Sequence, residues 1–433
     1  MLARLNEFFD IKGKGSSTQV EVLAGVSTFL SLSYIFVVNP AILSEAGMNK
    51  SAVLFATIIA SASATILMGL WARLPFVLAP GMEINAYVAF FVVGYLGFTW
   101  QQALGAVFWS GVIFVILTLA RVREKIIDAI PPRMKIGLSM SVGVFLALVA
   151  LKITGLLVYE NITIKGVGSL TSLPACALYV SLALILLLEK FRIMGAILIS
   201  IILTAILCHF LGIGNDGGPP ATASSAMFTG IGQLQLGVIA DSKMWSVILI
   251  LFLVDFFGSI AKFIGLAMST NIMFNGKLPR LKEALLIDGG AIILGSSLGT
   301  SSIIVYVESA VGIGAGGRTG LTAVVCGLLM LACFLITPFL GLVPVVATTG
   351  ALIFVALKLC PSVRELKSYP KVDLVVLAVM QIIVIATFAI DRAMLAGFIV
   401  YLLIDLFRLR RPNPYLVAST TLLAIGALLQ IKS

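Results

Sequence analysis

Four acidic residues lie within long apolar stretches, where carboxyl groups are rare. They are Glu83, Asp255, Asp288 and Glu308. A charge inside a membrane costs free energy, and where one persists it usually has a function. Because desolvation disfavours the anion, such a carboxyl can take up and release a proton. It can also accept hydrogen bonds from the N–H groups of a ligand. These acids are therefore candidates for binding a polar substrate and for moving protons.

The neighbours of these acids suggest what the ligand is. Asn85 follows Glu83 by two residues, and its amide can donate and accept at once, which suits the edge of a purine. Phe256 follows Asp255 and could stack on a flat ring, although packing against lipid or core is the commoner role of such a ring. Together these residue types favour a heterocyclic substrate.

Two further charged residues have competing interpretations. Lys262 lies two helical turns after Asp255, so that it could pair with an acid of the site. Snorkelling of its ammonium group to the cytoplasmic surface is the favoured expectation. Asp288 lies near the inner end of its apolar run, and for it we favour a bond to backbone that a helix break leaves free.

The composition indicates the element that positions these residues, which is the membrane helix. Of the 433 residues, 60% are hydrophobic and 11% are charged, whereas soluble domains carry about 25% charged residues. Mean hydropathy is +1.14. We therefore predict an all-α polytopic membrane protein. The apolar runs are 20–38, 52–72, 83–94, 99–120, 134–157, 172–189, 193–213, 245–268, 281–297, 301–313, 319–341, 343–359, 373–390, 393–407 and 414–431.

The net charge of +10 could suggest nucleic acid, but the basic residues form short clusters between apolar runs. When the loops are alternated with the N-terminus inside, most of the 29 basic residues fall on the inner side. This asymmetry predicts a multi-pass plasma-membrane protein with a cytoplasmic N-terminus, in a bacterial inner membrane. No nucleic-acid partner is expected.

Two short segments interrupt the regular pattern of spans. LAPGMEINAY at 78–87 and LGTSSIIVYVES at 298–309 stand third in the two halves of the chain, and each has Gly or Pro before a short helix. Broken helices at matching positions are typical of inverted-repeat transporters, whose substrate site lies near the membrane midplane. The predicted organisation is a cytoplasmic segment 1–19, spans in 20–120, spans in 134–213, an external loop 214–244, spans in 245–341 and C-terminal spans in 343–431.

Enzyme chemistry finds no support in the sequence. The segment GIGAGGRT at 312–319 nearly matches a phosphate-binding loop, but it joins two membrane helices rather than a strand and a helix of a soluble domain. The HExxH motif is absent, and the five cysteines lack the spacing of metal ligands. We expect no enzyme activity, no cofactor and no metal.

Several motifs resemble those of the nucleobase–cation symporters, most closely the AzgA-like purine permease branch. The segment TQVEVLAGVSTFLSLSYIFVVNPAIL at 18–43 resembles the first helix of that family, and APGMEINAY at 79–87 resembles its APGMGLNAY. VDFFGSIAKFIGLA at 254–267 is similar to VDFFDTxGTLxGVA. The longest likeness is LGTSSIIVYVESAVGIGAGGRTGLTAVV at 298–325.

The resemblance implies a fold of about 14 spans in two inverted repeats of seven. Spans 1–4 and 8–11 would form a core domain that carries the site, the others a gate domain, and the protein would form a homodimer. It also implies a secondary active transporter for proton-coupled uptake of a purine (guanine, hypoxanthine, adenine or a xanthine-like base). Asn85, Asp255 and Glu308 would bind the base, with Thr300 and Ser301 of the last motif beside them. Asp255 and Glu308 would couple transport to protons.

Three residues depart from the pattern of that family. Glu83 stands where a glycine is usual, Gly258 replaces the second acid of DFFD, and Lys262 replaces a threonine. Glu83 could do part of the work of the missing acid. Alternatively, the same fold could transport another small solute, such as a pyrimidine or an inorganic or organic anion. A non-transporting scaffold or receptor is disfavoured, because it has no need of several buried carboxyls.

Overall fold

The computed structural model describes residues 2–120, 132–160, 163–193, 195–213, 225–268, 278–337, 343–388 and 390–407, and four residues between 417 and 424. The predicted last span, 414–431, lies almost wholly outside the described residues. The same holds for the first part of the predicted external loop, 214–224.

Hydrogen-bonding residues set the starts of many helices in the first half of the chain. Ser17 caps α2, Asn49 caps α4, and Thr99 forms a capping box at the start of α6. The elements of this half are α1 Leu2–Phe9, α2 Thr18–Leu32, α3 Ile35–Ser44, α4 Lys50–Leu67, η1 Met68–Ala72, β1 Leu78–Pro80, α5 Met82–Ala86, η2 Tyr87–Val93, α6 Trp100–Leu119, α8 Pro132–Ile153, β2 Leu157–Glu160, β3 Thr163–Val167, α9 Leu173–Lys190 and α10 Ala196–Phe210.

The second half repeats the alternation of long helices with one broken segment. The elements are η3 Ser225–Phe228, η4 Leu236–Ala240, α11 Ser242–Met268, α12 Leu281–Leu298, β4 Ile303–Val305, α13 Ser309–Gly314, α14 Gly320–Ala332, η5 Cys333–Ile336, η6 Val345–Thr348, α16 Thr349–Leu359, α17 Val363–Lys367, α18 Lys371–Thr387 and α19 Ile390–Phe407. α11 is the longest of these described helices, and at 1.5 Å per residue its 27 residues extend about 40 Å.

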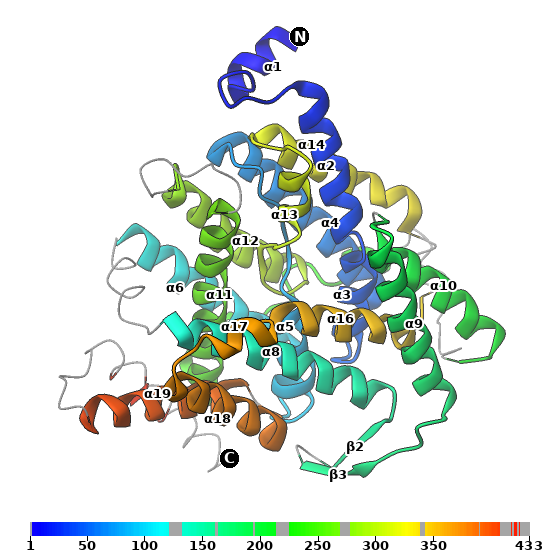
Figure 1. Cartoon of the computed structure of the whole chain (residues 1–433), viewed down its shortest axis with the longest axis vertical. Helices are drawn as coiled ribbons and strands as arrows, with labels where there is room; N and C mark the ends of the chain where they lie inside the picture. The colour runs from blue at the N-terminus through cyan, green and yellow to red at the C-terminus, as the bar shows by residue number, and fades with distance from the viewer. Residues whose placement is uncertain are drawn as a thin grey trace.

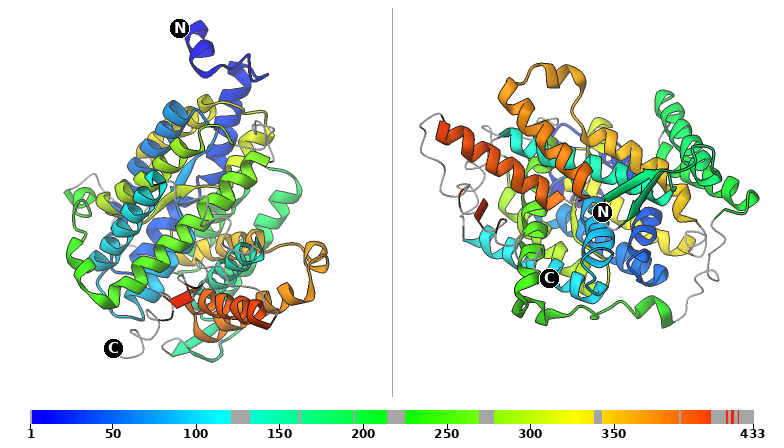
Figure 2. Two further views of the ribbon diagram at one scale, coloured as in Figure 1. Left: turned by 90° about the vertical axis from the view of Figure 1, so that its left-hand side faces the viewer. Right: turned by 90° about the horizontal axis from the view of Figure 1, so that it is seen from below.

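The described helices pack in two groups. In one group α2 and α4 pack on α14, α6 packs on α11 and α12, and α3 packs on α4. In the other group α8 packs on α16, α18 and α19, and α9 packs on α10 and α16. Figures 1 and 2 show the orange and red C-terminal helices gathered with α8, apart from α2, α4, α12 and α14. Contacts of α8 with α5 and α11 join the two groups.

The chain is a multi-pass membrane protein. Within the described residues, six helical segments are long and apolar enough to cross a membrane: Thr18–Ser44, Lys50–Ala72, Trp100–Leu119, Leu173–Lys190, Ser242–Ala267 and Val345–Lys367. Shorter apolar helices at Met82–Val93, Ser139–Ile153, Ala196–Phe210 and Gly320–Leu335 accompany them. Helices broken near mid-membrane fall below the length of a simple span. The predicted count of 14 spans therefore stays a prediction, whereas the mainly helical architecture is observed.

Two short antiparallel strand pairs correct the expectation of an all-α chain. β1 pairs with β4, and β2 pairs with β3 in a hairpin after α8. The run 301–313 was expected to be one apolar helix, but β4 occupies its first part and only α13 is helical. The β-branched sequence IIV favours the extended backbone, and a paired strand satisfies the backbone groups that the missing helix turns would have bonded.

Glycines permit the closest approach between helices of the first group. A Cβ on Gly320 would lie 2.0 Å from the carbonyl oxygen of Gly69, so any side chain there would force α14 away from η1. Gly299 ends α12 with φ +95°, a conformation that glycine adopts without strain, and its backbone lies against Gly230. This turn directs the chain from α12 into β4.

Candidate functional site

The two broken segments predicted from the sequence meet in the middle of the fold. Leu78 pairs with Val305 and Pro80 with Ile303. Beyond the strands, the Gly81 amide donates to the Ser302 carbonyl over 2.9 Å. Each segment then continues into a helix, α5 or α13. The pairing holds residues more than 200 positions apart at fixed relative positions, which a binding site requires.

Buried polar side chains of neighbouring helices hold each strand. The Leu78 amide donates to the Thr65 hydroxyl on α4 over 2.9 Å, and the Val305 amide donates to Asp288 Oδ1 on α12 over 2.8 Å. Both side chains are fully buried. Asp288 thus bonds backbone beside a helix break, which is the role that the sequence favoured for it.

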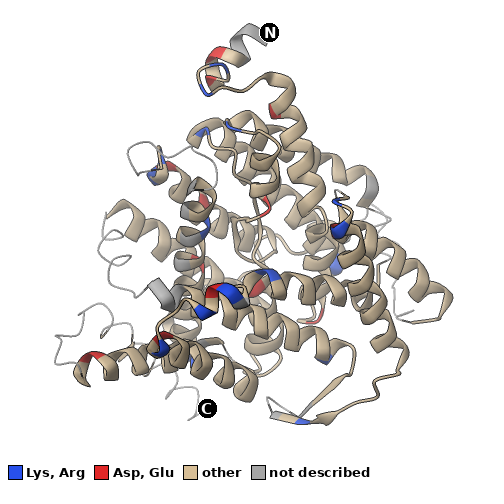
Figure 3. Ribbon diagram, in the orientation of Figure 1, with Lys and Arg blue, Asp and Glu red and all other residues tan. Residues whose placement is uncertain are grey.

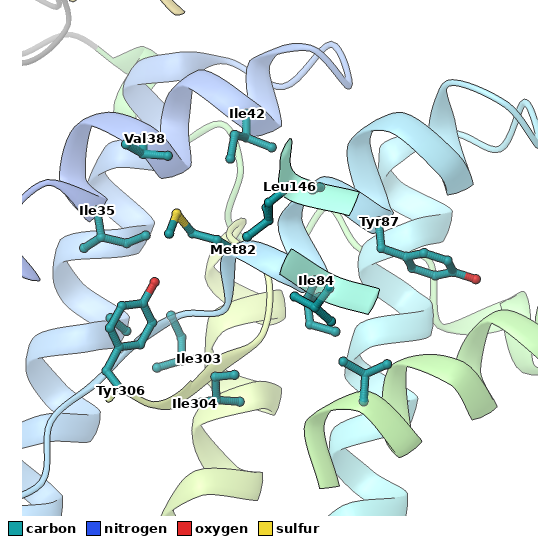
Figure 4. Packing of buried hydrophobic residues seen from close by; sticks show 14 of the residues in the cluster. Ile35, Val38, Ile42, Met82, Ile84, Tyr87, Leu146, Ile303, Ile304 and Tyr306 are labelled. Atoms are coloured by element: carbon teal, nitrogen blue, oxygen red, sulfur yellow. The ribbon is translucent and has the colours of Figure 1, made fainter. Parts of the chain in front are cut away.

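Apolar side chains surround the paired strands. Figure 4 shows Met82 directed towards Ile35 and Val38 of α3, with Tyr306 and Ile303 nearby. All of these residues are at least 95% buried. In such a low-dielectric setting, the polar groups that remain interact strongly with one another and with any ligand that enters.

Asp255 lies fully buried on α11, with its two carboxyl oxygens in different environments. Oδ2 accepts a hydrogen bond of 2.7 Å from the Ser302 hydroxyl, in the turn before β4. Oδ1 is buried and accepts no hydrogen bond from the described residues. A buried carboxyl oxygen without a donor is costly, so this atom is available to a ligand N–H or to a proton.

Glu308 repeats this arrangement at the start of α13. Its Oε1 accepts a hydrogen bond of 2.7 Å from the Tyr34 hydroxyl, between α2 and α3. Its Oε2 is buried and has no hydrogen-bond partner among the described residues. The site therefore presents two carboxyl groups, each with one oxygen held by a neighbouring hydroxyl and one oxygen unoccupied.

Asn85, Thr300 and Ser301 come together as the sequence led us to expect, but they bond with one another and with α3. The Asn85 amide donates to Asn39 Oδ1, and the Ser301 hydroxyl donates to Asn85 Oδ1. Asn39 also donates to the Thr300 hydroxyl over 2.9 Å. All four side chains are fully buried. In this conformation the network fixes α3 to both broken segments.

Lys262 corrects the expectation that it would snorkel to the cytoplasmic surface. Its Nζ lies 3.0 Å from Glu83 Oε1, and the side chains of Lys262 and Glu83 are only 14% and 15% exposed. Coulombic interactions extend from this pair to both Asp255 and Glu308. The alternative interpretation, pairing with an acid of the site, is therefore the one observed, because α5 brings the Glu83 carboxylate within reach of the ammonium group.

Two other predicted site residues on α11 have clear surroundings. The Phe256 ring packs edge-on against Phe114, with centroids 5.6 Å apart, and lies 5.1 Å from the Phe252 ring. The ring thus contributes to packing between α6 and α11 in this conformation. Gly258 is half-buried, and a Cβ built there would meet no atom within 4 Å. Open space therefore exists beside the position where the resembling family carries an acid.

The hydroxyl groups that hold the acids were not among the site residues predicted from the sequence. Ser302 lies in the LGTSS motif, and Tyr34 and Asn39 lie in the segment SYIFVVNP. Both segments belong to the motifs that resemble the family, so the motifs could have indicated these residues, whereas polar residue type alone did not. Figure 3 shows acidic and basic segments among the helices near the centre of the view, in a ribbon that is otherwise mostly uncharged. Among the described residues, no three His, Cys, Asp or Glu side chains gather as metal ligands.

Comparison with known proteins gives the family. The Permease family with the model name Xan_ur_permease matches residues 19–390. The chain belongs to this family. It is a transporter rather than an enzyme, and the match includes both broken segments and the four acids Glu83, Asp255, Asp288 and Glu308. This permease is 36% identical to the adenine permease AdeP of Escherichia coli (strain K12), over 95% of the chain and 93% of AdeP.

Further relatives agree with this assignment. The permease is 34% identical to the guanine/hypoxanthine permease PbuG of Bacillus subtilis (strain 168), over 92% of the chain and 93% of PbuG. Among solved structures, the transmembrane domain of the cyanobacterial bicarbonate transporter BicA matches with a TM-score of 0.64. That match has 15% identity and covers 88% of this chain and 97% of the other. At this identity the likeness concerns the transporter fold alone.

Proposed function

We propose that this permease is a secondary active transporter that takes up a purine nucleobase together with protons. The single observation that supports this most is the pair of acids Asp255 and Glu308, each with one buried oxygen that has no hydrogen-bond partner among the described residues. A purine offers ring N–H groups to such acceptors. The relatives AdeP and PbuG, whose printed substrates are purine bases, support the same substrate class.

Proton coupling follows from the free-energy cost of an unpaired carboxylate in the site when no substrate is bound. A carboxylate with an unoccupied oxygen is unfavourable in a membrane interior, and a proton or a ligand N–H relieves that cost. A carrier that must return without substrate would therefore return protonated, so substrate binding and protonation become linked. Asp255 and Glu308 are the coupling groups in this scheme. Glu83 is excluded because Lys262 already compensates its charge.

Alternating access would use the two helix groups. Helices α2–α6 and α11–α14 would form a core domain that carries the paired strands, and α8–α10 with α16–α19 would form a gate domain. The core would move against the gate across the contacts of α8 with α5 and α11. We further propose a homodimer in the bacterial inner membrane, and the distribution of basic residues supports a cytoplasmic N-terminus.

Uptake into proteoliposomes tests this function. Radiolabelled hypoxanthine, guanine and adenine would be offered with and without an inward proton gradient, and at least one purine should accumulate only with the gradient. Asp255→Asn and Glu308→Gln should each lower gradient-driven uptake at least about tenfold, since loss of one charged acceptor costs 1.4 kcal/mol or more. Glu189→Gln is the matched control, because Glu189 forms only an exposed ion pair of 3.7 Å with Lys358.

The same assay separates the alternative substrates. Uracil, sulfate and bicarbonate would be offered under identical gradients. Accumulation of one of these solutes with no response to purines would refute the purine assignment. Normal uptake by both acid variants would refute the assigned roles of Asp255 and Glu308.

A further inference from the structure

The ion pair between Glu83 and Lys262 places a cation inside the candidate site. Glu83 belongs to the first turn of α5, directly after β1, and Lys262 belongs to α11. Their closest atoms are 3.0 Å apart. The ammonium group also lies 5.9 Å from the ring centre of Tyr306, the residue that follows β4. Lys262 thus reaches from α11 to residues that follow each of the paired strands.

The ammonium group has hydrogen-bonding capacity left over. A lysine donates three hydrogen bonds and accepts none. Among the described residues, Glu83 Oε1 is the acceptor for one of these bonds, and the remaining N–H groups have none. Because the side chain is 14% exposed, these N–H groups are not wholly enclosed by protein. They can donate to an acceptor on a bound molecule.

One face of α11 combines this donor with acceptors and space. Asp255, Gly258, Ser259 and Lys262 follow the i, i+3, i+4, i+7 spacing that puts residues on one side of a helix. Gly258 lies between the acid and the cation along the helix, and a Cβ built on it would meet no atom within 4 Å. The buried Ser259 hydroxyl has no partner among the described residues, and neither has Asp255 Oδ1. The face therefore offers an acceptor, a gap, a hydroxyl and a donor in that order.

The chemistry of this face distinguishes between purines. In a 6-oxopurine that carries its imidazole proton on N9, the carbonyl oxygen O6 and the ring nitrogen N7 form one continuous acceptor edge, which lysine and arginine recognise in nucleic acids. Adenine presents an amino donor at the place of O6, so an ammonium group on that edge meets a like donor. Asparagine and glutamine, which donate and accept, are the side chains that fit adenine there. A lysine in the site thus favours an oxo group.

We propose that Lys262, held in place by Glu83, is the residue that selects 6-oxopurines over adenine, by donating to the O6/N7 edge while Asp255 accepts from a ring N–H. The proposal rests on the proposed function and specifies its substrate class as hypoxanthine, guanine or xanthine. Correct pairing at one such edge is worth about 5- to 150-fold in discrimination. Glu83 is a positioning residue, since it orients the ammonium group without contacting the base.

Competition uptake in proteoliposomes tests the selection. The wild-type protein would take up radiolabelled hypoxanthine in the presence of unlabelled adenine, guanine or xanthine, and adenine should compete at least about fivefold less well than the oxopurines. In the double variant Glu83→Gln with Lys262→Gln, the two amides can still bond to each other, but the cation is gone. This variant should lose the oxopurine preference and gain relative affinity for adenine. Lys243→Gln, an exposed lysine at the start of the same helix, should leave the ratio unchanged.

Each outcome of this experiment bears on a different claim. Wild-type protein that binds adenine as well as hypoxanthine would overturn the selection by Lys262, while leaving the proposed purine transport intact. The same holds if the paired glutamine variant keeps the wild-type ratio within twofold. Wild-type protein that takes up no purine would overturn the proposed function and this inference with it. A thermal shift on each purified variant, with and without hypoxanthine, reports folding and binding independently of transport.

Discussion

Replacing only one residue of the Glu83–Lys262 pair should destabilise the protein more than replacing both. At 3.0 Å and an effective dielectric constant of about 20, the Coulomb attraction is about 5 kcal/mol, and desolvation offsets part of it. Loss of one partner from a fully buried pair costs about 3–5 kcal/mol. Because each side chain is about one-seventh exposed, we expect about 2–4 kcal/mol for Lys262→Met or Glu83→Gln alone.

This free energy translates into a measurable thermal shift. With the usual unfolding entropy per residue, a chain of 433 residues loses about 1 °C of Tm per kcal/mol, so each single variant should melt about 2–4 °C lower. The double variant Glu83→Gln with Lys262→Met should recover most of the loss, because no unpaired charge remains. The assay is thermal unfolding in detergent, monitored by size-exclusion recovery. Additive losses, with the double variant as unstable as the sum of the singles, would refute the pairing argument.

Two further predictions concern the frame that carries the site. Asp288→Leu removes the acceptor of the Val305 amide and should lower the free energy of unfolding by about 1–3 kcal/mol, whereas Asp288→Asn keeps an acceptor oxygen and should retain most of that stability. Equal losses for the two variants in thermal unfolding would contradict the role of Asp288 in holding the strand. Gly320→Ala puts a methyl group 2.0 Å from the Gly69 carbonyl oxygen and should reduce the yield of folded protein. Gly314→Ala, at a position with open space around it, should not. Equal yields would show that α14 does not need this close approach.

Local patterns in the sequence accounted for the parts of the site that local physics controls. Apolar runs predicted membrane helices, because a helix satisfies its own backbone in lipid. Pro80 and Gly81 in the first broken segment and Gly299 in the second predicted the two breaks, since proline and glycine interrupt the regular hydrogen-bond ladder of a helix. Asp255 and Glu308 were predicted as site residues because a carboxyl group inside an apolar run costs free energy and usually has a function. Each of these inferences depends only on residues that are near one another in the sequence.

Other features depend on contacts between residues far apart in the chain, and only the tertiary structure decided them. Whether Lys262 reaches water or Glu83 depends on where α5 lies relative to α11, a placement that no helical periodicity encodes. The pairing of β1 with β4 and the hydroxyls of Tyr34 and Ser302 on the two acids are likewise long-range contacts. The sequence by itself thus determined a membrane carrier with buried acids. The fold decided which acid is compensated by a cation and which two keep an oxygen unoccupied, because electrostatic energy depends on distances in space rather than along the chain.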